Sequence, residues 1–144
     1  MPSRFFPTPQ DVETAFYEAL ERGDVEAMME VWAEDDDIVC VHPAGPRLAG
    51  QDQVRAGWVA ALAGGRAMRV HVSHEIRMAG TLVAVHSVHE SFLVEGESSP
   101  RGPVIATNIY LRTPSGWRMA VHHASPMAGA MASPPSDDAA KLLH

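Results

Sequence analysis

Apolar residues recur at helical spacing in three segments of the first half of the chain, residues 9–22, 25–32 and 51–62. Thr8 precedes the first segment as a typical N-cap residue, and Gly23 follows it as a typical terminator. Only Gly23 and Asp24 separate the first two segments. The pattern therefore predicts three helices, of which the first two form a hairpin with almost no loop.

The hydrophobic period changes to two in the second half of the chain. Residues 68–78, 82–94, 104–111 and 116–125 alternate or are rich in β-prone side chains, and turn residues separate them. Residues 38–42 predict a short earlier strand, followed by a loop. We therefore expect a short strand between the second and third helices, and then a meander of four long antiparallel strands.

Alternation also predicts which side chains share a face of each strand. In the short strand, Ile38, Cys40 and His42 fall on one side, and in the second long strand Val83 and Val85 oppose Leu82 and Ala84. In the first long strand, one side is predicted to carry Val70, Val72, His74, Ile76 and Met78.

The order of these elements predicts an α+β domain with helices on one face of a curved antiparallel sheet. We expect an N-terminal arm over residues 1–8, one domain over residues 9–126 and a tail over residues 127–144 with little structure. The tail is rich in Ala, Gly, Ser and Pro, and we expect it to be poorly determined or to lie across a second subunit through Leu142 and Leu143.

Composition narrows the classes of partner. The net charge of -7 and the single lysine, Lys141, argue against binding to nucleic acid or to an anionic membrane. One cysteine cannot form an internal disulfide, and no apolar run approaches the roughly 18 residues of a membrane span. We therefore expect a cytoplasmic protein.

Several local motifs follow one another in a recognisable order. These are the sequence Leu20-Glu21-Arg22-Gly23-Asp24, the sequence Met29-Glu30-Val31-Trp32-Ala33, His42-Pro43, Gly50 with Val54 and Trp58, and a last strand from Gly116-Trp117-Arg118 to His123-Ala124-Ser125. Over residues 9–126 this order resembles the nuclear transport factor 2-like superfamily, in its SnoaL-like and ketosteroid-isomerase-like branch. The resemblance implies a cone-shaped α+β fold with three N-terminal helices on a curved, mainly antiparallel sheet.

The resemblance also implies positions for a site in the cone. In the isomerase branch a carboxylate base precedes the Pro after the first strand, and His42 occupies that position here. Asn108 occupies the place of an oxyanion-binding acid, and Phe16 replaces a helix-one tyrosine, with Tyr17 adjacent but off the apolar stripe. Because Asn108 and Phe16 replace the two acidic groups that bind the oxyanion in that branch, steroid isomerase activity is not expected.

His42 and Asn108 each allow two interpretations. A neutral His42 imidazole suits proton transfer near neutral pH, but it suits equally a histidine hydrogen-bonded at a pocket rim. Asn108 lies in an apolar run, where its amide must find partners. It either donates to a substrate oxygen or bonds a neighbouring histidine or the backbone.

Further candidates follow from strand parity. His122 and His123 point to opposite faces, and the isomerase alignment favours His123 for the cone interior and His122 for a subunit interface. Cys40 is expected to be a small buried hydrophobe, too far from His42 for a direct hydrogen bond. His86, Glu90 and Arg118 rank lower as site residues, and the expected ligand-binding set is Phe16, Trp32, Trp58, Cys40, His86 and Tyr110.

No metal or other cofactor is expected. The pairs His71/His74, His86/His89 and His122/His123 have odd spacings, which send the two side chains of a strand to opposite faces. Clustering of ligands from different strands stays open.

Three functional hypotheses remain. The first is a domain that binds a small, largely apolar molecule in a cone pocket, with isomerase- or lyase-type acid–base chemistry by His42, Asn108 and His123 if it is an enzyme. The second is a non-catalytic association domain like the kinase association domain of the same fold, and the third is a vestigial fold with structural polar groups. In each case both faces of the sheet are apolar while helices cover one, which predicts a homodimer.

Overall fold

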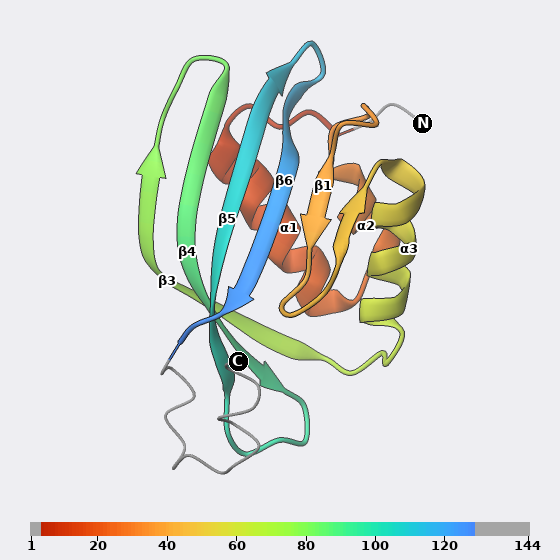
Figure 1. Ribbon diagram of the computed structural model, residues 1–144, viewed down its shortest axis with the longest axis vertical. Coiled ribbons are helices and arrows are strands. Elements are labelled where there is room, and N and C mark those ends of the chain that lie inside the picture. The colour runs from red at the N-terminus through yellow and green to blue at the C-terminus, as the bar shows by residue number, and fades with distance from the viewer. Residues whose placement is uncertain (1–3, 129–144) are drawn as a thin grey trace.

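Three helices cover one face of a six-stranded sheet in this computed structural model, which describes residues 4–128 (Figure 1). The architecture is the expected α+β cone. The helices are α1 (Pro9–Arg22), α2 (Val25–Glu30) and α3 (Gln51–Leu62), and the strands are β1 (Val39–Val41), β2 (Arg47–Ala49), β3 (Met68–Met78), β4 (Val83–Val94), β5 (Arg101–Thr113) and β6 (Gly116–Pro126).

The helix hairpin begins and ends where the sequence predicted. The Thr8 side chain accepts a hydrogen bond from the Asp11 backbone N–H, and Gly23 ends α1 in the left-handed conformation with φ 66°. The Asp24 side chain then accepts from the Ala27 N–H and caps α2. Each cap satisfies backbone groups that a helix end leaves without partners.

The sheet is antiparallel except at one junction. Its strand order is β2-β1-β6-β5-β4-β3, and the parallel pair is β1 with β6. The meander of β3 to β6 is confirmed. Strand β2 lies partly in the segment predicted to be a loop, and it pairs with β1 as a short hairpin that starts at Val41 and Arg47.

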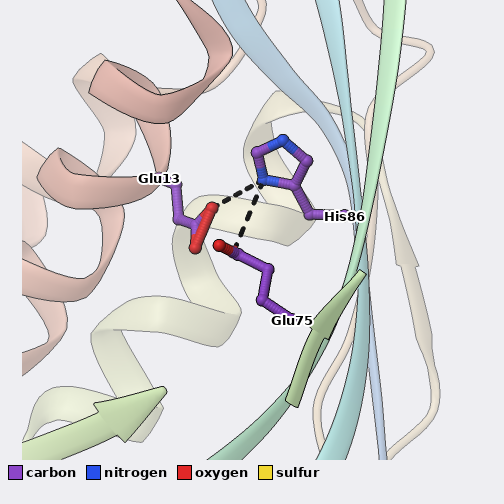
Figure 2. A group of neighbouring side chains, drawn as sticks. All are labelled: Glu13, Glu75 and His86. Carbon is purple, nitrogen blue, oxygen red and sulfur yellow. Dashed lines mark hydrogen bonds and ion pairs between the residues drawn. The ribbon is translucent and has the colours of Figure 1, made fainter. Parts of the chain in front are cut away.

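A β-bulge divides β3 into two halves with opposite parity. The register with β4 shifts between Ser73 and Ile76, and His74 adopts a φ of 52°. Val70 and Val72 pack against the core as predicted, whereas Ile76 is 64% exposed. The predicted common face of β3 is therefore wrong beyond Val72, and the bulge turns Glu75 toward the helices (Figure 2).

A second bulge changes the parity of β6. Ile109 pairs with Val121 while Tyr110 pairs with Met119, so that Ala120 is the extra residue. As a result His122 is buried and His123 is exposed on the opposite face. The prediction that His123 faces the cone interior is wrong for this reason.

Phe6, in the segment before α1, belongs to the core. Phe6 is buried, its backbone pairs with Gly116, and its carbonyl accepts a hydrogen bond of 2.8 Å from the Trp117 N–H. Gly116 has a φ of 97°, and a Cβ there would lie 2.8 Å from Phe6 backbone atoms, so glycine permits this close approach. The Arg118 guanidinium donates to the Arg4 and Trp117 carbonyls and lies over the Phe6 ring.

Two sequence predictions concern the ends and the environment of the chain. The proposed contacts of Leu142 and Leu143 lie outside the described residues. Within residues 4–128, no helix is long and apolar enough to cross a membrane.

Candidate functional site

A chain of hydrogen bonds runs through the interior of the cone from β4 to β6. The Tyr17 hydroxyl on α1 donates to the carboxylate of Glu90 on β4. The same hydroxyl accepts a bond of 3.1 Å from the Nδ2 of Asn108 on β5. The Oδ1 of Asn108 lies 2.6 Å from the Nδ1 of His122 on β6. Glu90, Tyr17, Asn108 and His122 are all buried, so four separate elements fix this network.

The directions of these bonds define the state of His122. The amide nitrogen of Asn108 donates to Tyr17, so the amide oxygen of Asn108 faces His122. An amide oxygen can only accept a hydrogen bond, and the imidazole of His122 therefore carries its proton on Nδ1. Burial lowers the pKa of His122 to about 3, so the ring is neutral at physiological pH. Its Nε2 is therefore an unprotonated nitrogen. Of the two readings of Asn108, the hydrogen bond to a neighbouring histidine is the one observed.

Glu90 and Tyr17 form the other end of the network. Burial raises the pKa of Glu90 to about 7, although the hydrogen bond from Tyr17 works in the opposite direction. Burial also raises the pKa of Tyr17, so the phenol keeps its proton. A carboxyl group that titrates near neutral pH thus lies in the interior of the domain, bonded to the phenol of Tyr17.

His42 lies at the end of β1 and remains partly exposed. Its ring contacts Trp58 edge to face at 4.5 Å between centroids, and burial lowers its pKa. The Nε2 of His42 is 3.8 Å from the Cys40 sulfur, which is within the range of a hydrogen bond to sulfur, so the prediction that these residues are too far apart for a direct hydrogen bond is wrong. Burial raises the pKa of Cys40 to about 12, which keeps the thiol protonated and fits the prediction of a buried hydrophobe.

Aromatic rings surround His122. Phe16 lies 4.8 Å and Trp58 lies 6.1 Å from its ring centroid. The indole Nε1 of Trp58 is buried and has no hydrogen-bond partner among residues 4–128. The absence of a side chain at Gly57 leaves space for Leu48 and His42, since a Cβ on residue 57 would lie 2.3 Å from Leu48 and 3.4 Å from the Nε2 of His42.

A second polar cluster lies beside the first. The Nδ1 of His86 on β4 is 2.6 Å from Glu13 on α1 and 3.9 Å from Glu75 on β3 (Figure 2). Burial and the neighbouring Glu75 raise the pKa of Glu13 to about 8. Tyr110 lies between the two clusters: its ring is 4.8 Å from that of His86, and it shares the buried face of β5 with Asn108, two residues earlier.

The structure thus brings together some of the predicted residues and separates others. His42, Phe16, Trp58 and Asn108 lie around His122, and Cys40 adjoins His42. His86 and Tyr110 belong to the second cluster. Trp32 is buried where it pairs with Met119, and Arg118 contacts the N-terminal arm.

Sequence reasoning missed three inward-facing residues. Tyr17 was placed off the apolar stripe of α1 and Glu13 was not considered, although Glu13, Phe16 and Tyr17 are spaced at three and four residues and so share a broad helix face. That spacing was the available signal. For Glu75 the signal was absent, because only the bulge in β3 turns it inward.

A surface hollow lies apart from both clusters. It has a volume of about 570 Å³ and lies between the C-terminal end of α1 and the adjoining ends of β3 and β4, lined by Glu21, Arg22, Ala67, Met68, Arg69 and residues 93–97. It contains no residue of the hydrogen-bond chain.

Comparison with known families agrees with this architecture. Residues 10–129 match the model of the SnoaL-like domain. The chain belongs to the SnoaL-like domain family. No curated protein sequence matches this chain.

Two solved structures share both fold and sequence with this SnoaL-like domain. A protein of Thiobacillus denitrificans, named for the calcium/calmodulin-dependent protein kinase type II association domain, is 42% identical with a TM-score of 0.76, covering 86% of this chain and 98% of its own. A Streptomyces avermitilis protein, named as a dehydratase of the NTF2-like family, is 32% identical with a TM-score of 0.73, covering 81% and 91%.

A third structure shows the fold alone. An NTF2-like protein of Pseudomonas putida is 19% identical with a TM-score of 0.72, and the similarity covers 81% of this chain and 82% of that one. The membership of the chain in the NTF2-like superfamily, through its SnoaL-like branch, is therefore confirmed.

Proposed function

We propose that this SnoaL-like domain binds a small, largely apolar carbonyl compound in the cone and transfers a proton on it, as an isomerase or lyase does. One observation carries the proposal: the buried indole N–H of Trp58 has no partner and lies beside the neutral imidazole of His42. A buried donor without a partner is costly to a fold, and a ligand oxygen would satisfy it.

The roles follow from the geometry. The unprotonated nitrogen of His42 takes a proton from the carbon next to the carbonyl, and the carbonyl oxygen accepts a hydrogen bond from Trp58 as negative charge develops on it. His42 then returns the proton to another carbon of the ligand, or gives it to a departing hydroxyl group that leaves as water. Because His42 is partly exposed, it forms the side of the site that opens to solvent.

The buried network positions the inner wall of this site. His122, held by Asn108, keeps one nitrogen free of protons at neutral pH and lies against Phe16 and Trp58. It offers an acceptor to a ligand hydroxyl. The Streptomyces avermitilis relative named as a dehydratase supports a lyase reaction.

The test is hydrogen exchange next to a carbonyl group. A panel of small cyclic ketones and β-hydroxy ketones is incubated with the protein in D₂O, and loss of the α-proton signals is followed by NMR. We expect His42→Gln to slow exchange by about 100-fold or more. Trp58→Phe, which keeps the ring and removes the donor, should slow it about 10- to 100-fold.

His123→Gln is the matched control, because His123 lies exposed on the other face of the sheet. It should exchange at the rate of the unchanged protein. Equal rates for His42→Gln and His123→Gln would exclude His42 as the base. A panel that neither exchanges nor moves the Trp58 indole N–H resonance would argue against the site as a whole.

A second candidate function is self-association through the outer sheet face. This face carries Ile76, 64% exposed, and Val83, 44% exposed, and among residues 4–128 no helix covers it (Figure 1). The Thiobacillus denitrificans relative named for an association domain supports this reading. A second copy of the chain, in a two-fold contact, is the occupant we propose.

Light scattering at micromolar concentration tests this candidate. We expect a dimer or larger, and a shift toward monomer for the double variant Ile76→Glu, Val83→Glu. Val59→Glu is the matched control, because Val59 is an equally exposed apolar residue on α3. A monomeric unchanged protein would refute self-association and leave the interior site unaffected.

A further inference from the structure

Glu13, Glu75 and His86 present three metal-ligand atoms to one point inside the cone. Figure 2 shows the carboxylates of Glu13 from α1 and Glu75 from β3 converging on the imidazole of His86 from β4. The three ligand atoms all lie within 4.8 Å of one another. We propose that these residues bind one divalent first-row metal ion of the Zn²⁺ or Mn²⁺ type.

The distances are close to those of a coordination sphere. Nitrogen and oxygen ligands lie about 2.0–2.2 Å from Zn²⁺, so two ligands of one ion lie up to about 4.2 Å apart. The Nδ1 of His86 is 2.6 Å from Glu13 and 3.9 Å from Glu75. Neighbouring ligands of one such ion lie about 3.0–3.5 Å apart, so an ion would move the Glu13 oxygen slightly away from Nδ1 and the partly exposed Glu75 carboxylate slightly toward it.

The state of Glu75 favours coordination by one particular oxygen. Its Oε1 pairs with Arg77 at 2.7 Å, whereas its Oε2 is buried and has no hydrogen-bond partner. Arg77 therefore orients the carboxylate from outside and leaves Oε2 directed at His86, as outer-shell partners do in metal sites. Glu13, whose pKa is raised to about 8, gives up its proton when an ion binds, and the two carboxylates then outweigh the charge of Arg77.

A second unpartnered group lies next to His86. Tyr110 is 0% exposed, its hydroxyl has no hydrogen-bond partner in the described part of the chain, and its ring is 4.8 Å from the His86 ring. Three protein ligands leave at least one position of a Zn²⁺ ion for water. The Tyr110 hydroxyl is placed to bond such a water, which would satisfy a buried polar group that the protein itself leaves unpaired.

The donor set selects the class of ion. One imidazole nitrogen with two carboxylates suits Zn²⁺ or Mn²⁺ better than Ca²⁺ or Mg²⁺, which prefer oxygen ligands only. The bulge in β3 brings Glu75 to the two other ligands, since uninterrupted alternation would place Glu75 on the outer face.

The experiment is titration of the EDTA-treated, dialysed full chain with ZnCl₂ and, separately, with MnCl₂, followed by calorimetry. We expect one ion bound per chain for at least one of the two metals, and a rise in the melting temperature that grows with ion concentration. Glu75→Gln should weaken binding by at least about 100-fold and abolish the melting shift.

Two control variants separate this site from adventitious binding. Glu97→Gln removes a surface carboxylate that pairs with Arg101, and His89→Ala removes one of two stacked histidines on the outer face. Both should bind the ion like the unchanged protein. Glu13→Gln is a second site variant, so that a folding defect in one variant, checked by circular dichroism, does not decide the outcome.

Two results would overturn the proposal. The first is the absence of one-to-one binding of either ion by the unchanged protein at concentrations up to about 0.1 mM. The second is equal affinity of folded Glu75→Gln and Glu97→Gln, which would assign the binding to surface groups.

Discussion

Burial of Glu90 predicts a specific dependence of stability on pH. The pKa of this carboxyl is raised from 4.5 to about 7 in the folded protein, chiefly by burial. Below pH 4.5 the folded and unfolded states both hold the proton, and the folded state bears no charge at Glu90. As pH rises from 4.5 to 7, only the folded state keeps the proton, so each unit of pH costs stability.

The magnitude follows from the width of this window. A difference of one pKa unit corresponds to about 1.4 kcal/mol, so the shift from 4.5 to about 7 corresponds to about 3 kcal/mol. Glu90 is 2% exposed, so solvent screening reduces this value little. Glu90→Gln carries no titrating group and should not lose this stability. The free energy of unfolding of the unchanged protein, relative to that of Glu90→Gln, should therefore fall by about 3 kcal/mol between pH 4.5 and 7.5.

Urea unfolding followed by tryptophan fluorescence measures both proteins at each pH. Taking the difference between the two curves removes the contributions of other titrating groups, such as Glu13, that both proteins share. Tyr17→Phe supplies a second check. Its hydroxyl lowers the pKa of Glu90, so its removal should extend the loss of stability to higher pH. A difference between the unchanged protein and Glu90→Gln that stays constant from pH 4.5 to 7.5 would refute this reasoning.

Three further predictions concern packing and boundaries, and chemical denaturation checks each of them. Phe6→Ala should destabilise the protein by about 3–5 kcal/mol, because the described N-terminal segment belongs to the core, and a loss below 1 kcal/mol would contradict this. Asn108→Leu should cost about 1–3 kcal/mol by leaving the N–H of His122 without its acceptor, and an unchanged midpoint would contradict the network. Deletion of the chain after Pro126 should leave the folded domain intact, since every described helix and strand ends by that residue, and loss of cooperative unfolding would show that the boundary is wrong.

The sequence predicted the elements of this fold because their signals are local. Thr8, Gly23 and Asp24 mark helix ends by backbone chemistry that needs no tertiary partner, and the structure has its caps at these residues. The four long strands were likewise apparent from period-two patterns. Strand β2 was missed, because three residues at a sheet edge carry too short a pattern.

The faces of two strands could not be predicted by alternation. The bulges at His74 and Ala120 each insert one residue, which reverses the parity of everything that follows in the strand. Neither position carries glycine or proline as a marker. His122 was therefore assigned outward and Glu75 was not considered, although parity before each bulge was correct.

The hydrogen-bond network has a consequence for how the chain is made. Tyr17 meets Glu90 and Asn108 across sequence separations of 73 and 91 residues, and β1 joins the long strands of the sheet only through β6, the last strand within residues 4–128. On a ribosome, the helix hairpin therefore emerges long before the strands that cover its apolar stripe. Contacts of such long range slow folding, so the nascent domain exposes its future interior until β6 leaves the exit tunnel. The side chains that make up the candidate site are then among the last to come together.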